Sequence, residues 1–408
     1  MITLSEAWSL ILPHVSALNP TRVQRQQSIG RVLAADLQAA VDVPPADVSA
    51  MDGYAVRGNV RPGTQYPVSA TIAAGDAPGR FLKRDTVVRI MTGAPLPSEA
   101  DRIVPIEATQ TNGTRITINT SPQVGAHIRR KGEIIGVRES MLAAGSLITP
   151  GTISVLATHG YDEVLVHRLP RIAVLATGDE VVPPEQVPGP GQLRDSHTDF
   201  LRAAASTLGL EIKSLGIAPD EPNQLTTMAA EGMAFDIFLI CGGVSMGEFD
   251  FVEGVLGELG CEVLFDAVAM QPGKPLVVAH HPGGLVFGLP GNPASVMVSF
   301  WLLVRPALRR LMGLHDGFWH GALKGHLTAP LTGAKSKDRF MSAEVEFGDG
   351  EILVTPVNAK GSHDLTAYAH GTALLRIPAN SGPAPVGAAC EVLPLADWRV
   401  AAATQRSD

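Results

Sequence analysis

The sequence predicts a multidomain chain in which an α/β domain is combined with smaller β domains and a split helical domain. Three observations support this fold class. The 408 residues are enough for two to four domains. Between residues 171 and 312, short apolar runs alternate with helical patterns, which is typical of a doubly wound parallel sheet. Around residues 43–120, and again beyond Gly317, short β-type runs are separated by glycine and proline, which indicates small β domains.

The composition excludes several classes of protein. Hydrophobic residues make up 45% of the chain and charged residues 18%, which argues against long disordered segments. The net charge is −8 and the longest basic run is Arg129–Lys131, so we expect neither nucleic acid nor an anionic membrane as a partner. The three cysteines are widely spaced, as in a reducing compartment. Without a basic leader or a spanning apolar stretch, the sequence predicts a cytoplasmic protein.

The N-terminal part is predicted to be a helical domain interrupted by a β domain. Thr3 and Glu6 form a capping-box pattern that opens a helix, and Pro13 is expected to kink it. Further helices are predicted near residues 28–37 and 154–160. The composition changes at Val43 and again after Thr120, so the split helical domain is assigned to residues 1–42 and 128–168, and the inserted β domain to residues 43–127.

The second half is predicted to contain the α/β domain, at residues 169–316, followed by a C-terminal β-barrel or sandwich at residues 317–408. Apolar runs predict strands at residues 172–176, 237–241, 262–265, 276–279 and 285–288. Helical patterns predict helices at residues 198–208 and 294–312.

The turns that follow three of these strands carry the candidate site. After the strand at 237–241, Gly242, Gly243 and Ser245 can hold an anion with backbone and hydroxyl donors, and Glu248 and Asp250 offer metal-binding oxygens. A Gly-Gly pair on its own predicts only a tight turn. The other two strand ends, at residues 177–180 and 290–293, also carry glycine or carboxylates, and open α/β sheets bind ligands at this edge. We therefore expect one pocket for an anion and a metal ion.

Six short motifs give the chain a resemblance to a known family. They are SAMDGYA (49–55), RIMTGAP (89–95), ATGDE (176–180), GGVS (242–245), QPGKP (271–275) and LPGNP (289–293). In this order they resemble the MoeA family of molybdopterin molybdenumtransferases, which includes the E domain of gephyrin. The resemblance covers nearly the whole chain. It implies that the α/β part is a MoaB-like molybdopterin-binding domain and that the protein is a homodimer whose active cleft is shared between subunits.

The reaction implied by the resemblance is the insertion of molybdate into adenylylated molybdopterin with release of AMP, as a step of molybdenum cofactor biosynthesis. The implied partners are adenylyl-molybdopterin, molybdate and a MogA-like molybdopterin adenylyltransferase. The implied cofactor is Mg²⁺ or another divalent cation, held against the pyrophosphate of the substrate.

The resemblance also assigns roles to individual residues. The catalytic candidates are Asp52, Thr92, Glu180, Asp220 and Asp250, of which Glu180 and Asp250 are the metal ligands. Asp52 and Thr92 would reach the cleft from the partner subunit. The substrate-binding candidates are Gly242, Gly243, Ser245, Lys274, Pro290, Gly291, Asn292, Pro293 and Ser362.

The chain departs from the family pattern at four positions. Ile134 follows Gly132-Glu133 where relatives usually have an aspartate, and His197 stands where many have asparagine. Ala267 and Gln271 occupy positions that are lysines in some members, which leaves Lys274 as the main cation of that stretch. These differences are either ordinary variation or the mark of a paralogue with weakened turnover.

Two alternatives differ in class from the transferase. One is a catalytically weakened paralogue that serves as a molybdopterin-binding or scaffold protein. The other is a CinA-type enzyme that acts on nucleotide-like substrates and shares only the α/β domain. The motifs before Ala100 argue against the CinA-type alternative, because such proteins lack them.

Overall fold

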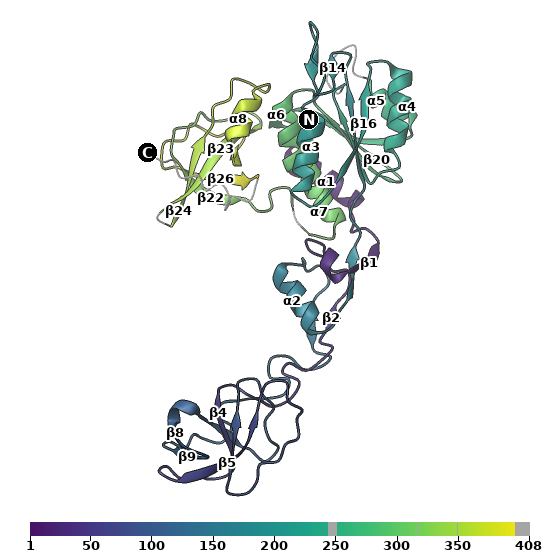
Figure 1. The fold of residues 1–408 in the computed structure, drawn as a ribbon. Helices are drawn as coiled ribbons and strands as arrows, with labels where there is room; N and C mark the ends of the chain where they lie inside the picture. Colours follow the sequence, from purple (N-terminus) through teal and green to yellow (C-terminus); the bar gives the residue numbers. More distant parts are fainter. Residues whose placement is uncertain (244–250, 316, 349, 396–408) are drawn as a thin grey trace. The chain divides into compact units, whose positions relative to one another are not determined.

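The computed structural model describes residues 1–243, 251–315, 317–348 and 350–395. The chain divides into two compact units. Unit 1 comprises Met1–Val23, Ser28–Ala34 and Leu165–Asp408, and unit 2 comprises Gln24–Gln27 and Ala35–Val164 (Figure 1). The four-domain division remains a prediction. Among the described residues, no helix combines the length and the apolar character needed to cross a bilayer.

Unit 1 is built around a six-stranded sheet. Its strands, in spatial order, are β16 (Ile212–Ala218), β13 (Ile172–Thr177), β17 (Ile237–Cys241), β21 (Gly284–Leu289), β20 (Pro275–His281) and β18 (Glu262–Ala267). The first four are parallel, as predicted, although the sequence analysis missed β16. The last two are antiparallel to their neighbours. Only residues 282–283 join β20 to β21, and a connection that short forms a hairpin, whereas parallel strands need a crossover.

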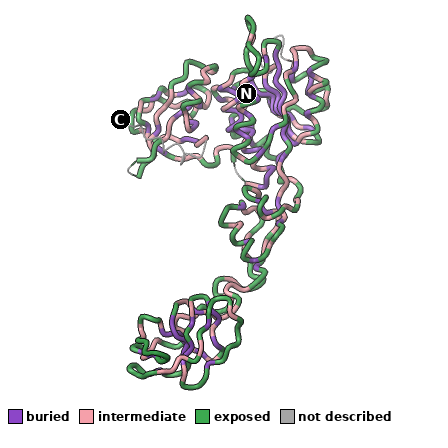
Figure 2. Tube along the Cα trace, viewed as in Figure 1, coloured by how far each residue is buried: buried purple, intermediate pink, exposed green. Residues whose placement is uncertain are grey.

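Helices cover both faces of this sheet, which gives three layers (Figure 1). One face packs against α1 (Leu4–Ile11), α3 (His197–Ser206), α6 (Pro293–Ser299), the π-helical segment η4 (Phe300–Val304) and α7 (Arg305–Leu311). The other face packs against α4 (Pro222–Gly232) and α5 (Val252–Glu258). Side chains alternate between the layers. Ile172 and Val174 enter the first core, and Ala173 and Leu175 enter the second, so β13 is buried on both faces (Figure 2).

The predicted helix at residues 294–312 is confirmed, with a π-helical segment inside it. Consecutive segments α6, η4 and α7 run from Pro293 to Leu311, and Pro306 lies at the start of α7. Proline has no N–H, and its ring clashes with the carbonyl group four residues earlier. The π-helical turn just before Pro306 accommodates the ring without ending the helix.

The N-terminal helix is confirmed, but the next predicted helix is wrong. Thr3 and Glu6 form the capping box, and the helix ends at Ile11 in the 3₁₀ turn η1 (Leu12–His14), which contains Pro13. Residues 28–37 form a turn and extended segments. Gly30 has a φ of +74°, and Leu33 forms a β-bridge with Val166, so long-range pairing outweighs local helical preference there.

Unit 2 contains the predicted β structure between residues 43 and 127. Its sheet has the order β7 (Arg102–Pro105), β4 (Gly53–Val56), β6 (Val87–Ile90), β5 (Gln65–Ile72), β9 (Arg115–Ile118) and β8 (Thr109–Asn112). The predicted helix near residues 154–160 forms as α2 (Pro150–Thr158). Only Leu156 of this helix is buried, so it is not the buried segment that its apolar composition suggested.

Short elements complete the chain. Two-stranded pairs are β1 (Pro20–Gln24) with β12 (Glu163–His167), β2 (Leu37–Gln38) with β11 (Ser140–Leu142), β3 (Val48–Ser49) with β10 (Ile128–Arg129), and β14 (Val181–Val182) with β15 (Leu193–Arg194). Two further 3₁₀ turns are η2 (Arg25–Gln27) and η3 (Ile106–Ala108).

The C-terminal part is a closed five-stranded barrel, which confirms the predicted β-barrel. It consists of β22 (Leu323–Leu327), β23 (Asp338–Gly348), β24 (Glu351–Pro356), β25 (Ala373–Ile377) and β26 (Ala389–Pro394). Pairing of β25 with β23 closes the ring. The short strand β19 (Met270–Gln271) adds to β23, and α8 (Leu365–His370) precedes β25. Phe340, Leu374 and Leu393 share one core with the helices of the sheet.

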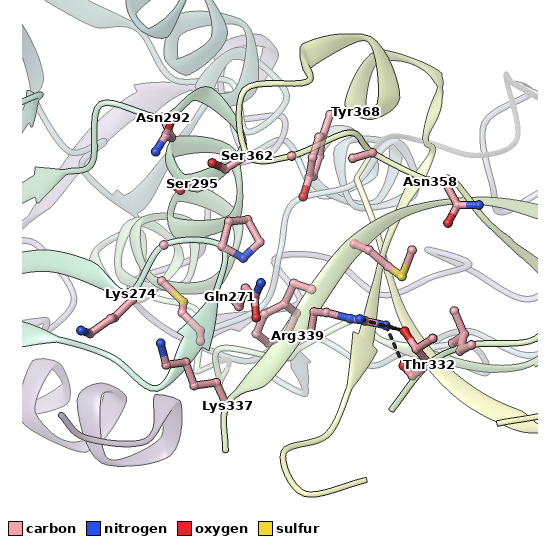
Figure 3. Close-up of a pocket in the computed structure, with 18 of the residues that line it drawn as sticks. Gln271, Lys274, Asn292, Ser295, Thr332, Lys337, Arg339, Asn358, Ser362 and Tyr368 are labelled. Carbon is pink, nitrogen blue, oxygen red and sulfur yellow. Dashed lines mark hydrogen bonds between the residues drawn. The ribbon is translucent and has the colours of Figure 1, made fainter. Parts of the chain in front are cut away.

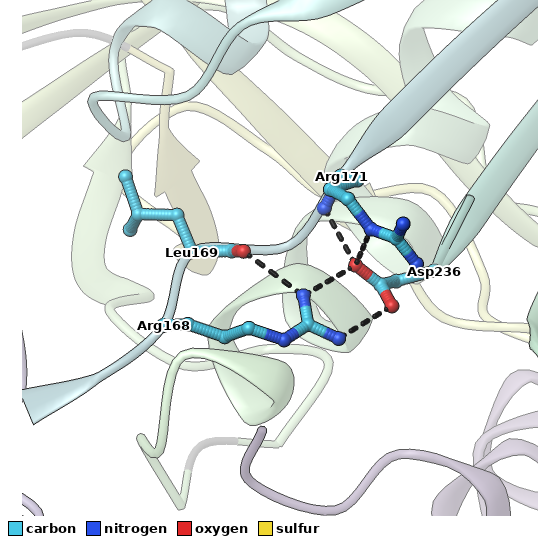
Figure 4. A network of polar contacts seen from close by, with 4 residues as sticks. All are labelled: Arg168, Leu169, Arg171 and Asp236. Atoms are coloured by element: carbon cyan, nitrogen blue, oxygen red, sulfur yellow. Dashed lines mark hydrogen bonds and ion pairs between the residues drawn. The ribbon is translucent and has the colours of Figure 1, made fainter. Parts of the chain in front are cut away.

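An ion-pair network around the buried Asp236 joins β13 and β17 at their amino-terminal ends (Figure 4). Asp236, which is buried, accepts hydrogen bonds of 2.7 Å from Nη1 and Nη2 of Arg168 and from the backbone N–H of Arg171. Burial opposes ionisation of Asp236, but the bonds from Arg168 and Arg171 outweigh it, so its pKa is held below its usual value. The network lies at the edge of the sheet opposite the turns that carry the candidate site.

Candidate active site

The carboxyl ends of the four parallel strands open into one cavity of about 740 Å³, which we call the carboxyl-edge cavity. All three predicted turns contribute to it, because parallel strands end at the same edge of a sheet. Its lining includes eight of the predicted site residues, namely Glu180, Asp220, Gly242, Gly243, Pro290, Gly291, Asn292 and Pro293. Ser245 and Asp250 lie outside the described residues.

The glycines of this edge allow the strand ends to approach each other closely. Gly242 has a φ of +105°, and a Cβ there would lie 2.6 Å from Oγ1 of Thr177. The hydroxyl of Thr177 in turn donates to the carbonyl oxygen of Cys241 at 3.3 Å. The N–H of Gly242 donates to Leu289 at 3.0 Å, so this donor is used within the protein. Gly242 lines the cavity, and its role in substrate binding stays a prediction.

Backbone donors remain available at three neighbouring positions. In the described part of the chain, the N–H groups of Gly243, Gly291 and Asn292 form no hydrogen bond. Gly243 has a φ of +66° and directly follows Gly242 at the end of β17. Gly291 and Asn292 directly precede α6. These N–H groups line the cavity and are suited to phosphate oxygens.

Carboxylates from three elements also line the cavity. The carboxylate of Glu180 folds over Gly178, since a Cβ at Gly178 would lie 2.6 Å from Oε2 of Glu180. Asp220 follows β16, and its backbone N–H donates to Oδ1 of Asp179 at 3.1 Å. Asp195 was not predicted. Its Oδ1 accepts from the N–H groups of the first two residues of α3, at 3.0 and 3.1 Å.

Two other lining residues have shifted pKa values. Burial lowers the pKa of His197, and the nearby Asp195 carboxylate opposes that shift only in part. The imidazole is therefore mostly neutral at pH 7. Burial also raises the pKa of the Cys241 thiol, so Cys241 stays protonated and is a poor metal ligand.

A second cavity, of about 670 Å³, lies where the barrel meets the sheet, and we call it the junction cavity (Figure 3). It contains the predicted residues Lys274 and Ser362, and it shares Pro275 and Asn292 with the carboxyl-edge cavity. The sequence analysis missed two of its cations, Lys337 and Arg339. Three cations within residues 335–339 were the available signal, but only the fold places Lys337 and Arg339 in the same cavity as Lys274.

The polar groups of the junction cavity are well ordered. Arg339 donates from Nη2 to the carbonyl oxygen of Thr332 at 2.7 Å and from Nη1 to Oγ1 of Thr332 at 3.1 Å (Figure 3). Tyr368 also lines the cavity, and burial raises its pKa to about 12, so its hydroxyl remains a donor at pH 7. The backbone carbonyl of Ser362 accepts from the N–H of Ala294, in α6.

The last two predicted residues, Asp52 and Thr92, form a pair in unit 2. Oδ1 of Asp52 accepts from the backbone N–H of Thr92 at 2.7 Å and from its hydroxyl at 2.9 Å. The backbone hydrogen bond is the main reason why the pKa of Asp52 lies below its usual value. Asp52 is therefore a fixed carboxylate, ionised at neutral pH. Ile134, also in unit 2, has a side chain that is 70% exposed.

The donor set of the carboxyl-edge cavity fits one kind of metal ion. Among the described residues, no three His, Cys, Asp or Glu side chains converge to form a metal cage. Mg²⁺ keeps several water molecules and needs only one or two carboxylates together with substrate phosphates. Glu180 and Asp220, next to the free N–H groups of Gly291 and Asn292, suit such a shared, hydrated ion.

Comparison with known proteins identifies the family along nearly the whole chain. Residues 2–160 match the MoeA N-terminal region (domain I and II), residues 173–310 match the probable molybdopterin binding domain, and residues 324–395 match the MoeA C-terminal region (domain IV).

Individual relatives agree with these matches. A molybdopterin molybdenumtransferase of Staphylococcus aureus is 33% identical over 387 residues, which are 93% of this chain and 92% of the relative. The molybdopterin molybdenumtransferase of Nostoc sp. is 35% identical over an alignment that covers 86% of this chain and 83% of the relative. The crystal structure of the molybdopterin biosynthesis moea protein from Pyrococcus horikosii superimposes with a TM-score of 0.82 at 29% identity, covering 98% of this chain and all of that one. The chain therefore belongs to the MoeA family of molybdopterin molybdenumtransferases, the enzymes of molybdenum cofactor biosynthesis.

Proposed function

We propose that the two cavities of unit 1 together insert molybdate into adenylylated molybdopterin and release AMP. The observation that carries this proposal is their pairing. One cavity combines carboxylates with free backbone N–H groups, the adjoining cavity is lined by cations, and Pro275 and Asn292 line both. The substrate contains a pyrophosphate and a dithiolene, and the co-substrate is a dianion, so the reaction needs both environments side by side.

In the carboxyl-edge cavity, the chain would bind the pyrophosphate of the substrate. The N–H groups of Gly243, Gly291 and Asn292 donate to phosphate oxygens. Glu180 and Asp250 hold Mg²⁺, and Asp220 orients its water ligands. When bound, the metal ion stabilises the negative charge that develops as the bond to AMP breaks. Pro290 and Pro293 flank the donors and fix the turn that presents them.

In the junction cavity, Lys274 and Arg339 would hold molybdate by charge-assisted hydrogen bonds. Tyr368 and Ser362 add neutral donors. Because Asn292 lines both cavities, molybdate would be bound close to the dithiolene of a substrate whose pyrophosphate is bound in the adjoining cavity.

The proposed assembly is a homodimer, and the supplier of the substrate is a MogA-like adenylyltransferase. In such a dimer, Asp52 and Thr92 of one subunit complete the cleft of the other. Mixing inactive Asp52→Asn protein with inactive Asp250→Asn protein should then restore activity, because one cleft of each heterodimer keeps all its residues. Exchanged mixtures that stay inactive would contradict the shared cleft.

The function is tested by AMP release from purified protein, adenylyl-molybdopterin and Mg²⁺, with and without molybdate. We expect release to depend on molybdate, and we expect the gene to restore molybdenum cofactor synthesis in deficient cells. The alternative, a scaffold or binding protein, predicts substrate binding without AMP release. The names of the curated relatives do not favour that alternative.

A further inference from the structure

We propose that Lys337 is an oxyanion-binding residue of the junction cavity and supplies the positive charge that Gln271 does not. The inference rests on the proposed function and deepens it, since it names a residue that sets the affinity for molybdate. Lys337 and Gln271 line the same cavity, and Figure 3 shows both side chains extending into it. Lys337 lies in none of the six family motifs, so the sequence alone did not suggest it as a binding residue.

The register of β23 explains why Lys337 lies in the cavity. Side chains two residues apart on an extended segment point to the same side. Lys337 directly precedes β23 and Arg339 is its second residue, so both line the cavity. Gln271 of β19 is the direct partner of Arg339 in the parallel pair. The barrel strand thus brings Lys337 close to the position where some relatives have a lysine.

Asp338, which lies between the two cations in sequence, does not neutralise them. As the middle residue of an extended segment, it points to the other side. There its Oδ2 accepts from Nε and Nη2 of Arg376, at 3.1 and 2.9 Å, and its Oδ1 accepts from the N–H of Ala379 at 2.8 Å. In the described part of the chain, neither Lys337 nor Lys274 forms an ion pair. Their charges are available to a ligand.

A third, smaller cavity of about 410 Å³ adjoins this place. Lys337, Arg339 and Gln271 line it as well as the junction cavity, whereas the exposed Lys335 lines only the smaller one. The chain carries a net charge of −8. Lys335, Lys337 and Arg339 create a locally positive potential that attracts an oxyanion toward the junction cavity. Lys337 is common to both cavities and can hold the anion in either.

The test measures binding of molybdate alone by equilibrium dialysis, which does not depend on catalysis. Removing one charged partner of a partly buried anion costs about tenfold or more in affinity. We expect Lys337→Gln to raise the Kd for molybdate by about that factor. The matched control is Lys324→Gln, which removes the same charge from an exposed position on β22 that lines neither cavity. The control should stay within about twofold of the unmodified protein.

A second variant tests the link with residue 271. In the Lys337→Gln background, Gln271→Lys should recover most of the lost affinity, because it returns a cation to the same cavity. In AMP release, Lys337→Gln should raise the KM for molybdate about tenfold and change kcat little, as expected for a residue that binds the ground state.

The outcomes separate this inference from the proposed function. If the unmodified protein releases AMP in response to molybdate but Lys337→Gln behaves like Lys324→Gln, the inference is wrong and the function stands. A Gln271→Lys replacement that restores nothing contradicts the inference in the same way. If the unmodified protein neither binds molybdate nor releases AMP, both proposals fail together.

Discussion

The carboxyl-edge cavity and the junction cavity adjoin each other in unit 1, yet they are built in different ways. The first is formed by the turns at the ends of four parallel strands of one sheet, and its charged groups are mainly carboxylates. The second is formed where a barrel strand meets the PGKP stretch, and its charged groups are Lys274, Lys337 and Arg339. One offers backbone N–H groups and carboxylates to a ligand, and the other offers side-chain cations.

This difference matches what each cavity has to hold. A pyrophosphate with a hydrated cation needs donors and acceptors at fixed spacing, and backbone turns provide these at low conformational cost. A free tetrahedral dianion needs mainly compensating charge, which long side chains can supply from several directions. The comparison therefore predicts that the two cavities can be disabled separately.

The largest expected effect is on the stability of the six-stranded sheet, which supports both cavities. Asp236→Asn replaces the buried carboxylate that accepts three charge-assisted hydrogen bonds from Arg168 and Arg171 by a neutral amide, and it should lower the free energy of unfolding by about 3 kcal/mol. Urea denaturation measures this change. At temperatures where the variant is folded, both cavities should keep their affinities. If the folded variant lost ligand affinity in one cavity alone, the Asp236 network would support that cavity and not the other.

The same variant has a pH signature. The pKa of Asp236 is lower in the folded protein than in the unfolded chain, so its ionised form stabilises the fold above about pH 4. The contribution is lost as the pH falls through the folded-state pKa. The stability gap between the unmodified protein and Asp236→Asn should therefore narrow below about pH 4. If the difference in unfolding free energy stayed constant from neutral to acidic pH, the stabilising effect of Asp236 would come from its shape and packing and not from its charge.

The next largest effect should be confined to the carboxyl-edge cavity. Glu180→Gln removes a carboxylate that we propose as a metal ligand, and it should lower kcat/KM for AMP release about a hundredfold, which is about 2.7 kcal/mol. The Kd for molybdate alone should stay within about twofold. Glu185→Gln, at an exposed position outside the cavity, is the control. If turnover in Glu180→Gln were unchanged, Glu180 would not contribute to the active site.

The smallest effect should come from adding an acid. The resemblance to the MoeA family predicts an aspartate at position 134, and Ile134 here is 70% exposed, so Ile134→Asp should cost little stability. By restoring a cleft carboxylate, it should increase AMP release up to about tenfold at limiting Mg²⁺. Val137→Asp, at another exposed apolar position of the same segment, is the control. If Ile134→Asp and Val137→Asp released AMP at the same rate, the isoleucine at position 134 would have no functional consequence.

The sequence predicted one cavity much better than the other, for a physical reason. Strand ends of a parallel sheet meet at one edge whatever their details, so Glu180, Gly243 and Asn292 could be placed together before the fold was known. Asp220 was assigned only by the resemblance, because the strand before it, β16, was not predicted. The use of the Gly242 N–H by Leu289 could not be predicted, because it depends on the neighbouring strand. Likewise, Lys337 lines the same cavity as Lys274 only because β19 pairs with β23.

Two elements of the fold were mispredicted or missed for similar reasons. The segment at residues 28–37 has helical character, but Leu33 pairs with a residue more than a hundred positions away. The strand β16 contains glycine and a lysine, which hid its pattern. In contrast, the capping box at Thr3, the long helix and the strands at the centre of the sheet were predicted, because each depends on local sequence.

Pro275 and Asn292 line both cavities, so a ligand in one touches part of the wall of the other. Thermodynamic linkage then couples the two binding affinities. If adenylyl-molybdopterin raises the affinity for molybdate by some factor, molybdate must raise the affinity for adenylyl-molybdopterin by the same factor. With a shared wall that favours double occupancy, the enzyme would seldom hold one substrate without the other, and the bound dithiolene would rarely be without molybdate beside it.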